Sequence, residues 1–247
     1  MRRPAPVPFE GTLQPVSSRR TLQDEVHHGL AQALMAGRFD PGQTLTIAAL
    51  ADQFGTSHMP VREALRRLAA ENALEVSTSG TVVVPSVSRA RLDDLCDARL
   101  VVEGAAAERA APAMTAPVLR RLDHLAREHA EAGREKDAAA MLARNQEFHF
   151  GIYAASGSPV LMQLAGSLWL RFGPYLRMLT KQMEPLLGAG DIETYTRHHR
   201  DILEALGRGD AAEAGRHMRA DIASTQTLLQ PLCAVEEAAE ALPAKAE

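Results

Sequence analysis

The sequence is poor in aromatic residues and cysteine, and it contains no long apolar run. Aromatic residues make up 4% of the 247 residues, and the two cysteines, Cys96 and Cys233, are far apart. We expect two buried thiols in a reducing compartment, with a disulfide between helices as the alternative. No stretch approaches the length of a membrane-spanning helix, and the N-terminal segment lacks the apolar core of a secretory signal. These absences predict a soluble cytoplasmic protein with a disordered arm over residues 1–16.

The residues that are abundant favour helices. Apolar residues make up 46% of the chain, enough for a proper core, and Ala, Leu and Arg recur throughout. Residues 1–88 carry equal numbers of Arg and of Asp plus Glu, so the net charge of −4 belongs to residues 89–247. The overall acidity is therefore weak evidence against nucleic-acid binding by the N-terminal part.

The N-terminal part has the order of a winged helix-turn-helix. A helical pattern from Thr21 to about Ala36 is followed by a turn at "DPGQ", a short helix from Thr46 to Phe54 and a third helix from Ser57. The segment "LEVSTSGTVVVP", residues 74–85, then has two strand-like runs around Ser79-Gly80 and predicts a hairpin. We assign residues 17–85 to this domain and residues 86–88 to a linker.

The remainder of the chain shows only helical patterns. Six segments are separated by glycine or proline and predict a six-helix antiparallel bundle over residues 89–232, with a flexible tail at 233–247. The predicted fold is therefore mainly α. The expected helices cover about 89–111, 116–133, 136–155, 158–184, 190–207 and 210–231.

The segment "SHMPVREALRRLAAE" predicts a DNA-reading helix. In a helix-turn-helix the second helix of the motif enters the major groove with its N-terminal end first. Val61, Ala64, Leu65 and Leu68 have core spacing, and an arginine outside that stripe could bind guanine or a phosphate. The alternative is that Arg62, Arg66 and Arg67 form a solvated face together with Glu63 and Glu71. The expected DNA-binding residues are Ser57, His58, Met59, Arg62 and Arg66, together with Gly80 at the wing tip.

Residues 20–85 resemble the DNA-binding domain of the GntR family of bacterial transcription regulators. The "PG" turn, the "LADQFGTS" helix, "PVREAL" and the wing occur in the family's order. The resemblance implies that Ser57, His58, Arg62 and Gly80 lie at the DNA. Many relatives have a Glu-Arg pair early in the short helix, where this chain has Ile47 and Ala48. We therefore expect a different operator sequence, with one DNA contact missing.

Residues 89–231 resemble the FCD effector domain of the FadR subfamily, in its shorter VanR-like form. The motifs are "ARLVVEGAAAERAA", "RNQEFHFGIYAASGSPVL" and "RHHRDILEALGRGDAAEAGRHMRADI". Many such domains bind a divalent metal with one Asp and three His. The matching positions here are Asn145, His149, His199 and Asp221, which would suit Zn²⁺, Ni²⁺ or Mn²⁺.

Two neighbouring histidines have other expected roles. Adjacent residues on a helix point about 100° apart, so we expect His199 to face the core and His198 to be solvated. His217 lies one turn before Asp221 and could replace it as a ligand. Satisfied core histidines without a metal are the alternative for the whole set.

The effectors of the subfamily are mostly small carboxylates. The resemblance implies that such an effector would bind near the metal and pair with Arg99. The alternative for Arg99 is a buried pair with Glu103. Arg171 and Tyr175 are weaker pocket candidates, since their helix could equally be core or dimer surface.

The sequence thus predicts a ligand-responsive transcription regulator, a repressor that binds a palindromic DNA operator as a homodimer. One rival is a metal sensor, in which the ion itself is the signal. The other is a helical-bundle metalloenzyme, although the sequence lacks a Glu-x-x-His pair of the di-iron type, an HExxH motif and a glycine-rich phosphate loop.

Overall fold

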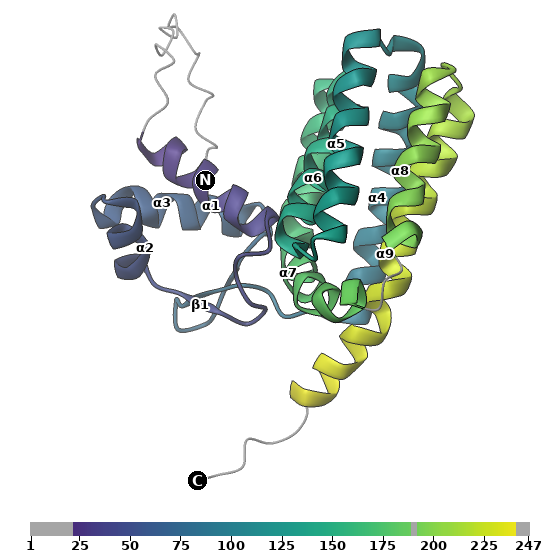
Figure 1. The fold of residues 1–247 in the computed structure, drawn as a ribbon. Coiled ribbons are helices and arrows are strands. Elements are labelled where there is room, and N and C mark those ends of the chain that lie inside the picture. The colour runs from purple at the N-terminus through teal and green to yellow at the C-terminus, as the bar shows by residue number, and fades with distance from the viewer. Residues whose placement is uncertain (1–21, 189–191, 241–247) are drawn as a thin grey trace, which may run out of the picture.

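The computed structural model describes residues 22–188 and 192–240, which form a small N-terminal domain beside a tall helical bundle (Figure 1). The expected disordered arm at 1–16 and residues 241–247 of the expected tail lie outside the described residues. In the described part, no helix has both the length and the apolarity needed to span a membrane. The prediction of a mainly α protein with an N-terminal winged helix-turn-helix is confirmed.

The N-terminal domain contains three helices and a three-stranded antiparallel sheet with strand order β1-β3-β2. The predicted hairpin is present as β2 and β3. Strand β1 was not predicted, because its partner β3 lies far along the chain and no turn joins the two; Thr44 and Leu45 pair with Val83 and Val82. The elements are α1 Leu22–Met35, β1 Thr44–Leu45, α2 Ile47–Phe54, α3 His58–Ala70, β2 Glu75–Val76 and β3 Val82–Val83.

Local signals fix the ends of α2. The Thr46 side chain accepts a hydrogen bond from the Ala49 N–H at its start, and Gly55 ends it with a left-handed φ of 60°. The tight link of Gly55 to Ser57 then reorients the chain into α3. The expected stripe of α3, from Val61 to Leu68, is buried in the domain core against α1.

Six helices and one 3₁₀ turn form the second domain in the described residues. Helix α4 packs along α9, and α5 packs along α6 (Figure 1). Helix α9 continues beyond residue 232, the expected domain end, to Glu240, because Leu229 and Cys233 are both buried on either side of Pro231. The elements are α4 Arg89–Ala110, η1 Ala111–Ala113, α5 Ala116–Arg134, α6 Ala138–Ala155, α7 Pro159–Gly188, α8 Ile192–Gly207 and α9 Ala211–Glu240.

Both cysteines are buried thiols, as expected, and no disulfide joins them. Burial raises the pKa of the Cys96 thiol to about 11. The side chain therefore behaves as a small apolar core residue.

The two domains meet where the end of α1 packs against α7. Gly37, just after α1, has a left-handed φ of 61°, and a Cβ there would lie 2.7 Å from the backbone nitrogen of Arg177. A Cβ on Gly173 would collide with the carbonyl oxygen of Leu34. Two glycines, one on each side, thus allow the two backbones to approach closely.

Polar contacts from α7 reach two further points of the N-terminal domain. The carboxylate of Asp40 accepts a hydrogen bond from Arg177 Nε at 2.7 Å and contacts Lys181 Nζ at 2.8 Å. The bonds from Arg177 and then Lys181 lower the pKa of Asp40 to about 2. Tyr175 donates its hydroxyl proton to the carbonyl of Ser88 and accepts the Ser88 N–H, so α7 also contacts the end of the linker.

We predict that Gly173→Ala weakens the contact between the domains, because the new methyl group has no space against Leu34. Overpacking of this kind costs about 1–3 kcal/mol. The expected result is a lower melting temperature and faster proteolysis of the linker. Gly166→Ala is the matched control on α7, since no atom lies within 4 Å of the added Cβ. Equal behaviour of the two variants would contradict the close packing of α1 on α7.

Candidate DNA-binding surface and effector cavity

The first turns of α3 present an exposed polar surface. Ser57, His58, Met59 and Arg62 are all exposed, and Met59 is 63% exposed, which is unusual for its residue type. Ser57 occupies the N-cap position with extended backbone, but its side chain makes no capping bond. Its hydroxyl and the first N–H groups of α3 therefore remain available to a phosphate.

The three arginines of α3 differ in their partners. Arg66 makes two hydrogen bonds to the carboxylate of Glu63, 3.0 Å from Nε and 2.5 Å from Nη2, and Arg67 donates to Asp24 at 2.8 Å. Within the described part of the chain, Arg62 has no ion pair or hydrogen bond. The alternative of a face of mutually paired charges thus applies to Arg66 and Arg67, and Arg62 is the cation left free for DNA.

The tip of the wing is held by a chain of hydroxyl groups. The hydroxyl of Ser79 lies 2.8 Å from that of Ser77 and 3.0 Å from that of Thr81, and the Thr81 N–H donates to Ser77. Gly80 has a φ of 81°, a conformation that favours glycine, and nothing lies within 4 Å of an added Cβ. The tip is therefore small, ordered and lined with hydrogen-bonding groups.

We predict that Arg62→Ala lowers operator affinity by about 1–3 kcal/mol if the guanidinium contacts a base. The measurement is fluorescence anisotropy with an operator duplex over a range of salt concentrations. Arg127→Ala, at an exposed arginine on α5, is the control and should leave operator affinity unchanged. Undiminished sequence-specific binding by the Arg62 variant would mean that α3 is not the recognition helix.

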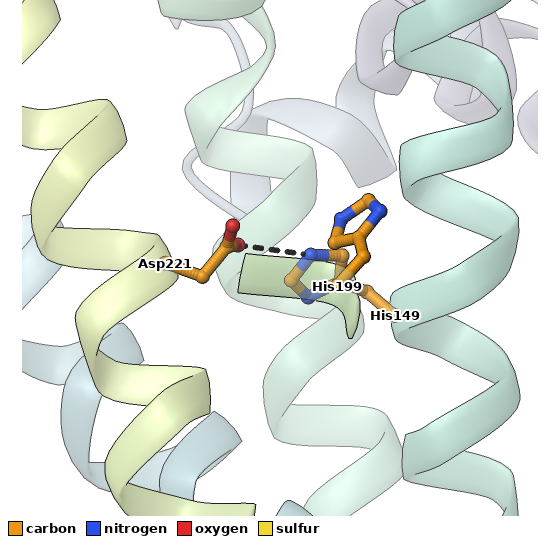
Figure 2. Close-up of side chains that lie close together, drawn as sticks. All are labelled: His149, His199 and Asp221. Carbon is orange, nitrogen blue, oxygen red and sulfur yellow. Dashed lines mark ion pairs between the residues drawn. The ribbon is translucent and has the colours of Figure 1, made fainter. Parts of the chain in front are cut away.

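In the second domain, the four predicted metal ligands lie close together. His149 and Asp221 extend toward each other from α6 and α9, with His199 of α8 beside them (Figure 2). His149 Nε2 lies 3.1 Å from Asp221 Oδ2, and His199 Nε2 lies 2.9 Å from Asn145 Oδ1. Donor atoms of His149, His199 and Asp221 all lie within 4.8 Å of one another. The two imidazoles are almost completely buried.

A chain of hydrogen bonds orients His149. Tyr153 donates its hydroxyl proton to Glu103, so its oxygen is left to accept the Nδ1–H of His149 at 2.9 Å. The Nε2 atom then presents a lone pair to the Asp221 carboxylate, without a hydrogen bond between them. Two acceptors at this distance need a proton or a metal ion between them. Such second partners of a ligand histidine are typical of metal sites.

The chemistry of the cluster fits a divalent ion. Burial lowers the pKa of His199 well below its usual range, which keeps this imidazole neutral, the form that binds metals. Burial alone would raise the pKa of Asp221, but with a proton on His149 between the two groups the interaction holds that pKa below its usual range, so the carboxylate stays ionised. Two imidazoles, one carboxylate and the oxygen of Asn145 match the ligand preferences of Zn²⁺, Ni²⁺ or Mn²⁺.

Sequence reasoning missed two histidines of this region. His129 of α5 is buried, its ring centroid lies 4.5 Å from that of His199, and burial lowers its pKa to about 4. Its place in the apolar stripe with Leu122 and Leu125 was a signal that could have identified it. His198 was expected to be solvated, but it lines the cavity and its Nδ1 is buried without a hydrogen-bond partner. His198 is therefore half-buried at the cavity wall, whereas the neighbouring His199 is almost completely buried.

The alternative ligand His217 lies elsewhere. Its nitrogens are 3.4 Å from Glu213 and 3.9 Å from Asp201, and it does not line the cavity in the described residues. It is thus a partner of surface acids. Asp221, and not His217, faces His149.

Arg99 lines the cavity, and it also forms the buried pair with Glu103 that was the alternative to effector binding. Its Nε and Nη2 donate to the two carboxylate oxygens at 2.6 and 3.2 Å. The guanidinium lies over the rings of Trp169 and Phe172, at 4.9 and 4.4 Å from their centroids. Burial alone would lower the pKa of Arg99, but Glu103 holds it above its usual range.

The cluster opens into a cavity with about 60 Å³ of free space. Tyr175 and Arg171, the weaker candidates, are outside the described lining, and Tyr175 contacts the linker instead. The polar lining residues are Arg99, His129, Asn145, His149, His198, Asp221, Ser224 and Thr225. The apolar ones are Met141, Leu142, Trp169, Phe172, Leu176, Leu179, Ile222 and Leu228.

The two domains match two known families. Residues 22–84 match the bacterial regulatory proteins of the gntR family, and residues 94–224 match the FCD domain. The chain therefore belongs to the GntR family of transcription regulators and carries an FCD domain of the FadR and VanR-like type. Both matched domains and the curated relatives are those of transcription regulators, and not of enzymes.

Particular relatives extend this likeness over most of the chain. The chain is 31% identical to the HTH-type transcriptional regulator McbR of Escherichia coli K12, over 87% of this chain and 94% of McbR. It is 28% identical to the HTH-type transcriptional repressor GlaR of the same organism, over 85% and 93%. The solved structure of E. coli McbR/YncC superposes with a TM-score of 0.80 at 28% identity, covering 86% of this chain and 98% of that structure.

We predict that His149→Ala lowers zinc affinity at least about 10–100-fold, because it removes a ligand of the cluster. Binding is measured by isothermal titration of the chelator-treated protein. His217→Ala is the matched control, a histidine of the same domain outside the cavity, and should bind zinc as the wild type does. Equal loss in both variants would place the ion elsewhere.

Proposed function

We propose that this regulator is a dimeric repressor whose DNA binding is controlled by a small carboxylate effector, bound beside a divalent metal in the FCD cavity. The observation that carries the proposal is that two side chains line both the cavity and a groove at the DNA-binding domain. Leu142 and Leu176 line the effector cavity and also a groove of about 450 Å³ beneath Met35 and Ala36, at the end of α1. An occupant of the cavity is therefore separated from the DNA-binding domain by two side chains.

The cluster supplies the polar end of the proposed effector site. His149, His199, Asp221 and Asn145 would hold the ion, which would supply positive charge and open coordination positions for a carboxylate. The N–H donors of Arg99 that Glu103 does not use would form hydrogen bonds with the effector carboxylate. They would add no net positive charge, because Arg99 and Glu103 together are neutral.

Helix α7 is the proposed route from cavity to DNA. Phe172 and Leu176 line the cavity, whereas Gly173, Tyr175 and Arg177 contact the N-terminal domain or its linker. A small shift of α7 would therefore change how the N-terminal domain is held. An effector can bias this equilibrium only by binding one arrangement more tightly than the other.

A dimer follows from the geometry of DNA recognition. One winged-helix domain reads one half-site, so two copies related by a two-fold axis would read a palindrome. The assignment as a repressor is supported by the relative GlaR, which is named a repressor.

A metal sensor is the second candidate, because the cluster alone has the donors of a metal site. In that case DNA binding would follow the free metal concentration without any organic ligand. In the effector proposal, by contrast, the ion stays bound and the change in DNA binding is caused by the carboxylic acid.

The test is operator affinity measured by anisotropy, with a duplex selected by the protein from a random pool. Metal-free, zinc-loaded, and zinc-loaded protein with a panel of carboxylic acids are compared. We expect zinc alone to change affinity little and one class of acid to lower it about 5–150-fold, the range typical of allosteric coupling. Affinity that follows zinc alone would identify a metal sensor, and no response to either would refute the proposal.

A further inference from the structure

The effector cavity changes character along its length. On α6, Asn145 and His149 are followed toward the N-terminus by Met141 and Leu142. On α9, Asp221 is two helical turns, about 10 Å, from Leu228. Ser224 and Thr225 line the cavity between these two, so on α9 hydroxyl groups occupy the middle of the cavity and Leu228 its far end. On both helices the end away from the histidine cluster is apolar.

Helix α7 has the same gradient. The ring of Trp169 lies 5.6 Å from that of His149, at the polar end, and Leu176 and Leu179 follow two to three turns later. Leu176 also lines the groove beneath α1. The apolar end of the cavity is therefore the end that faces the DNA-binding domain.

The charges that line the cavity leave room for one negative group. The only fixed cation among the described lining residues is Arg99, and Glu103 already neutralises it through two hydrogen bonds. With a divalent ion held by Asp221, one further carboxylate brings the polar end to neutrality. A second carboxylate, at the apolar end, would find leucine and methionine side chains and no cation, and burying an unpaired charge is strongly unfavourable.

We infer that the effector is a monocarboxylic acid with a short apolar tail, and not a dicarboxylic acid. This inference rests on the proposed function and names the class of ligand for the same site. The carboxylate lies at the histidine cluster, and the tail lies among Leu142, Leu176, Leu179 and Leu228. The cavity has only about 60 Å³ of free space, so the tail is a few carbons long.

The direction of the tail gives the ligand class a regulatory meaning. A tail that reaches Leu142 and Leu176 presses on the same two side chains that line the groove under Met35 and Ala36. An acid without a tail would fill the polar end and leave this wall untouched. Within the class, the effect on operator affinity should therefore increase with tail length until the cavity is full.

The test compares 4-methylpentanoate with succinate, binding to the full-length zinc-loaded protein by isothermal titration. The two acids have the same number of non-hydrogen atoms, and an isopropyl group in one replaces a carboxylate in the other. We expect the monocarboxylate to bind about 100-fold more tightly, because succinate would bury an unpaired charge. Succinate binding as tightly as 4-methylpentanoate would overturn the inference.

Leu179→Lys places a cation at the apolar end and should reduce or reverse the preference for the monocarboxylate. Leu164→Lys, at a 46% exposed position of α7 outside the cavity lining, is the control and should keep the wild-type preference. If the Leu179 variant does not fold, the wild-type comparison still decides.

The outcome can be separated from that of the proposed function by operator affinity. If dicarboxylic acids lower operator affinity and monocarboxylic acids do not, the ligand class is wrong and effector control stands. If no acid changes operator affinity, effector control itself fails. Tight binding of 4-methylpentanoate together with weakened operator binding supports both.

Discussion

Helix α7 packs against the DNA-binding domain on one side and lines the cavity of the second domain on the other. The relative position of the two domains depends on this double contact. One side supplies Trp169, Phe172 and Leu176 to the cavity beside the histidine cluster, and the other holds the end of α1 through Gly173 and the backbone around Arg177. Because packed protein interiors deform little, neither side can be altered without the other. The position of the DNA-binding domain and the shape of the cavity are thus properties of one helix.

The cluster at the other end of the cavity poses an electrostatic problem that a metal ion would solve. Tyr153, held by Glu103, fixes the proton of His149 on Nδ1, so that Nε2 faces the carboxylate of Asp221. The arrangement is costly when no cation is present, since two acceptors then face each other in a buried site. Arg99 belongs to the same network through Glu103, which connects the pocket's aromatic wall to the orientation of the histidine.

Much of this could be predicted from the sequence, for physical reasons. The apolar spacing of α3 and the glycines that end the bundle helices are local signals, and they located these elements closely. Strand β1 was missed because its partner β3 lies far along the chain, and the end of α9 was placed early because the acidic, alanine-rich segment that follows was expected to be flexible. Asn145, His149, His199 and Asp221 were predicted through resemblance, and the structure brings them together.

Other features depend on distances between elements, which the sequence does not reveal. The closeness of His129 to His199 joins α5 with α8, and the pairing of Arg66 but not Arg62 depends on rotamers. The shared role of Leu142 and Leu176 could be recognised only once both domains were placed. For Arg99 the spacing left two roles open, and the structure shows the pair with Glu103 while keeping the residue in the cavity wall.

The contact of Gly37 with α7 and of Gly173 with α1 also has an evolutionary consequence. Each glycine leaves space for a backbone in the other domain, so a larger residue at one position removes the reason to keep the other small. In relatives that hold the DNA-binding domain in a different orientation, both positions should be free to vary. Joint retention or joint loss of these two glycines would then record, in sequence alone, which relatives share this docked arrangement.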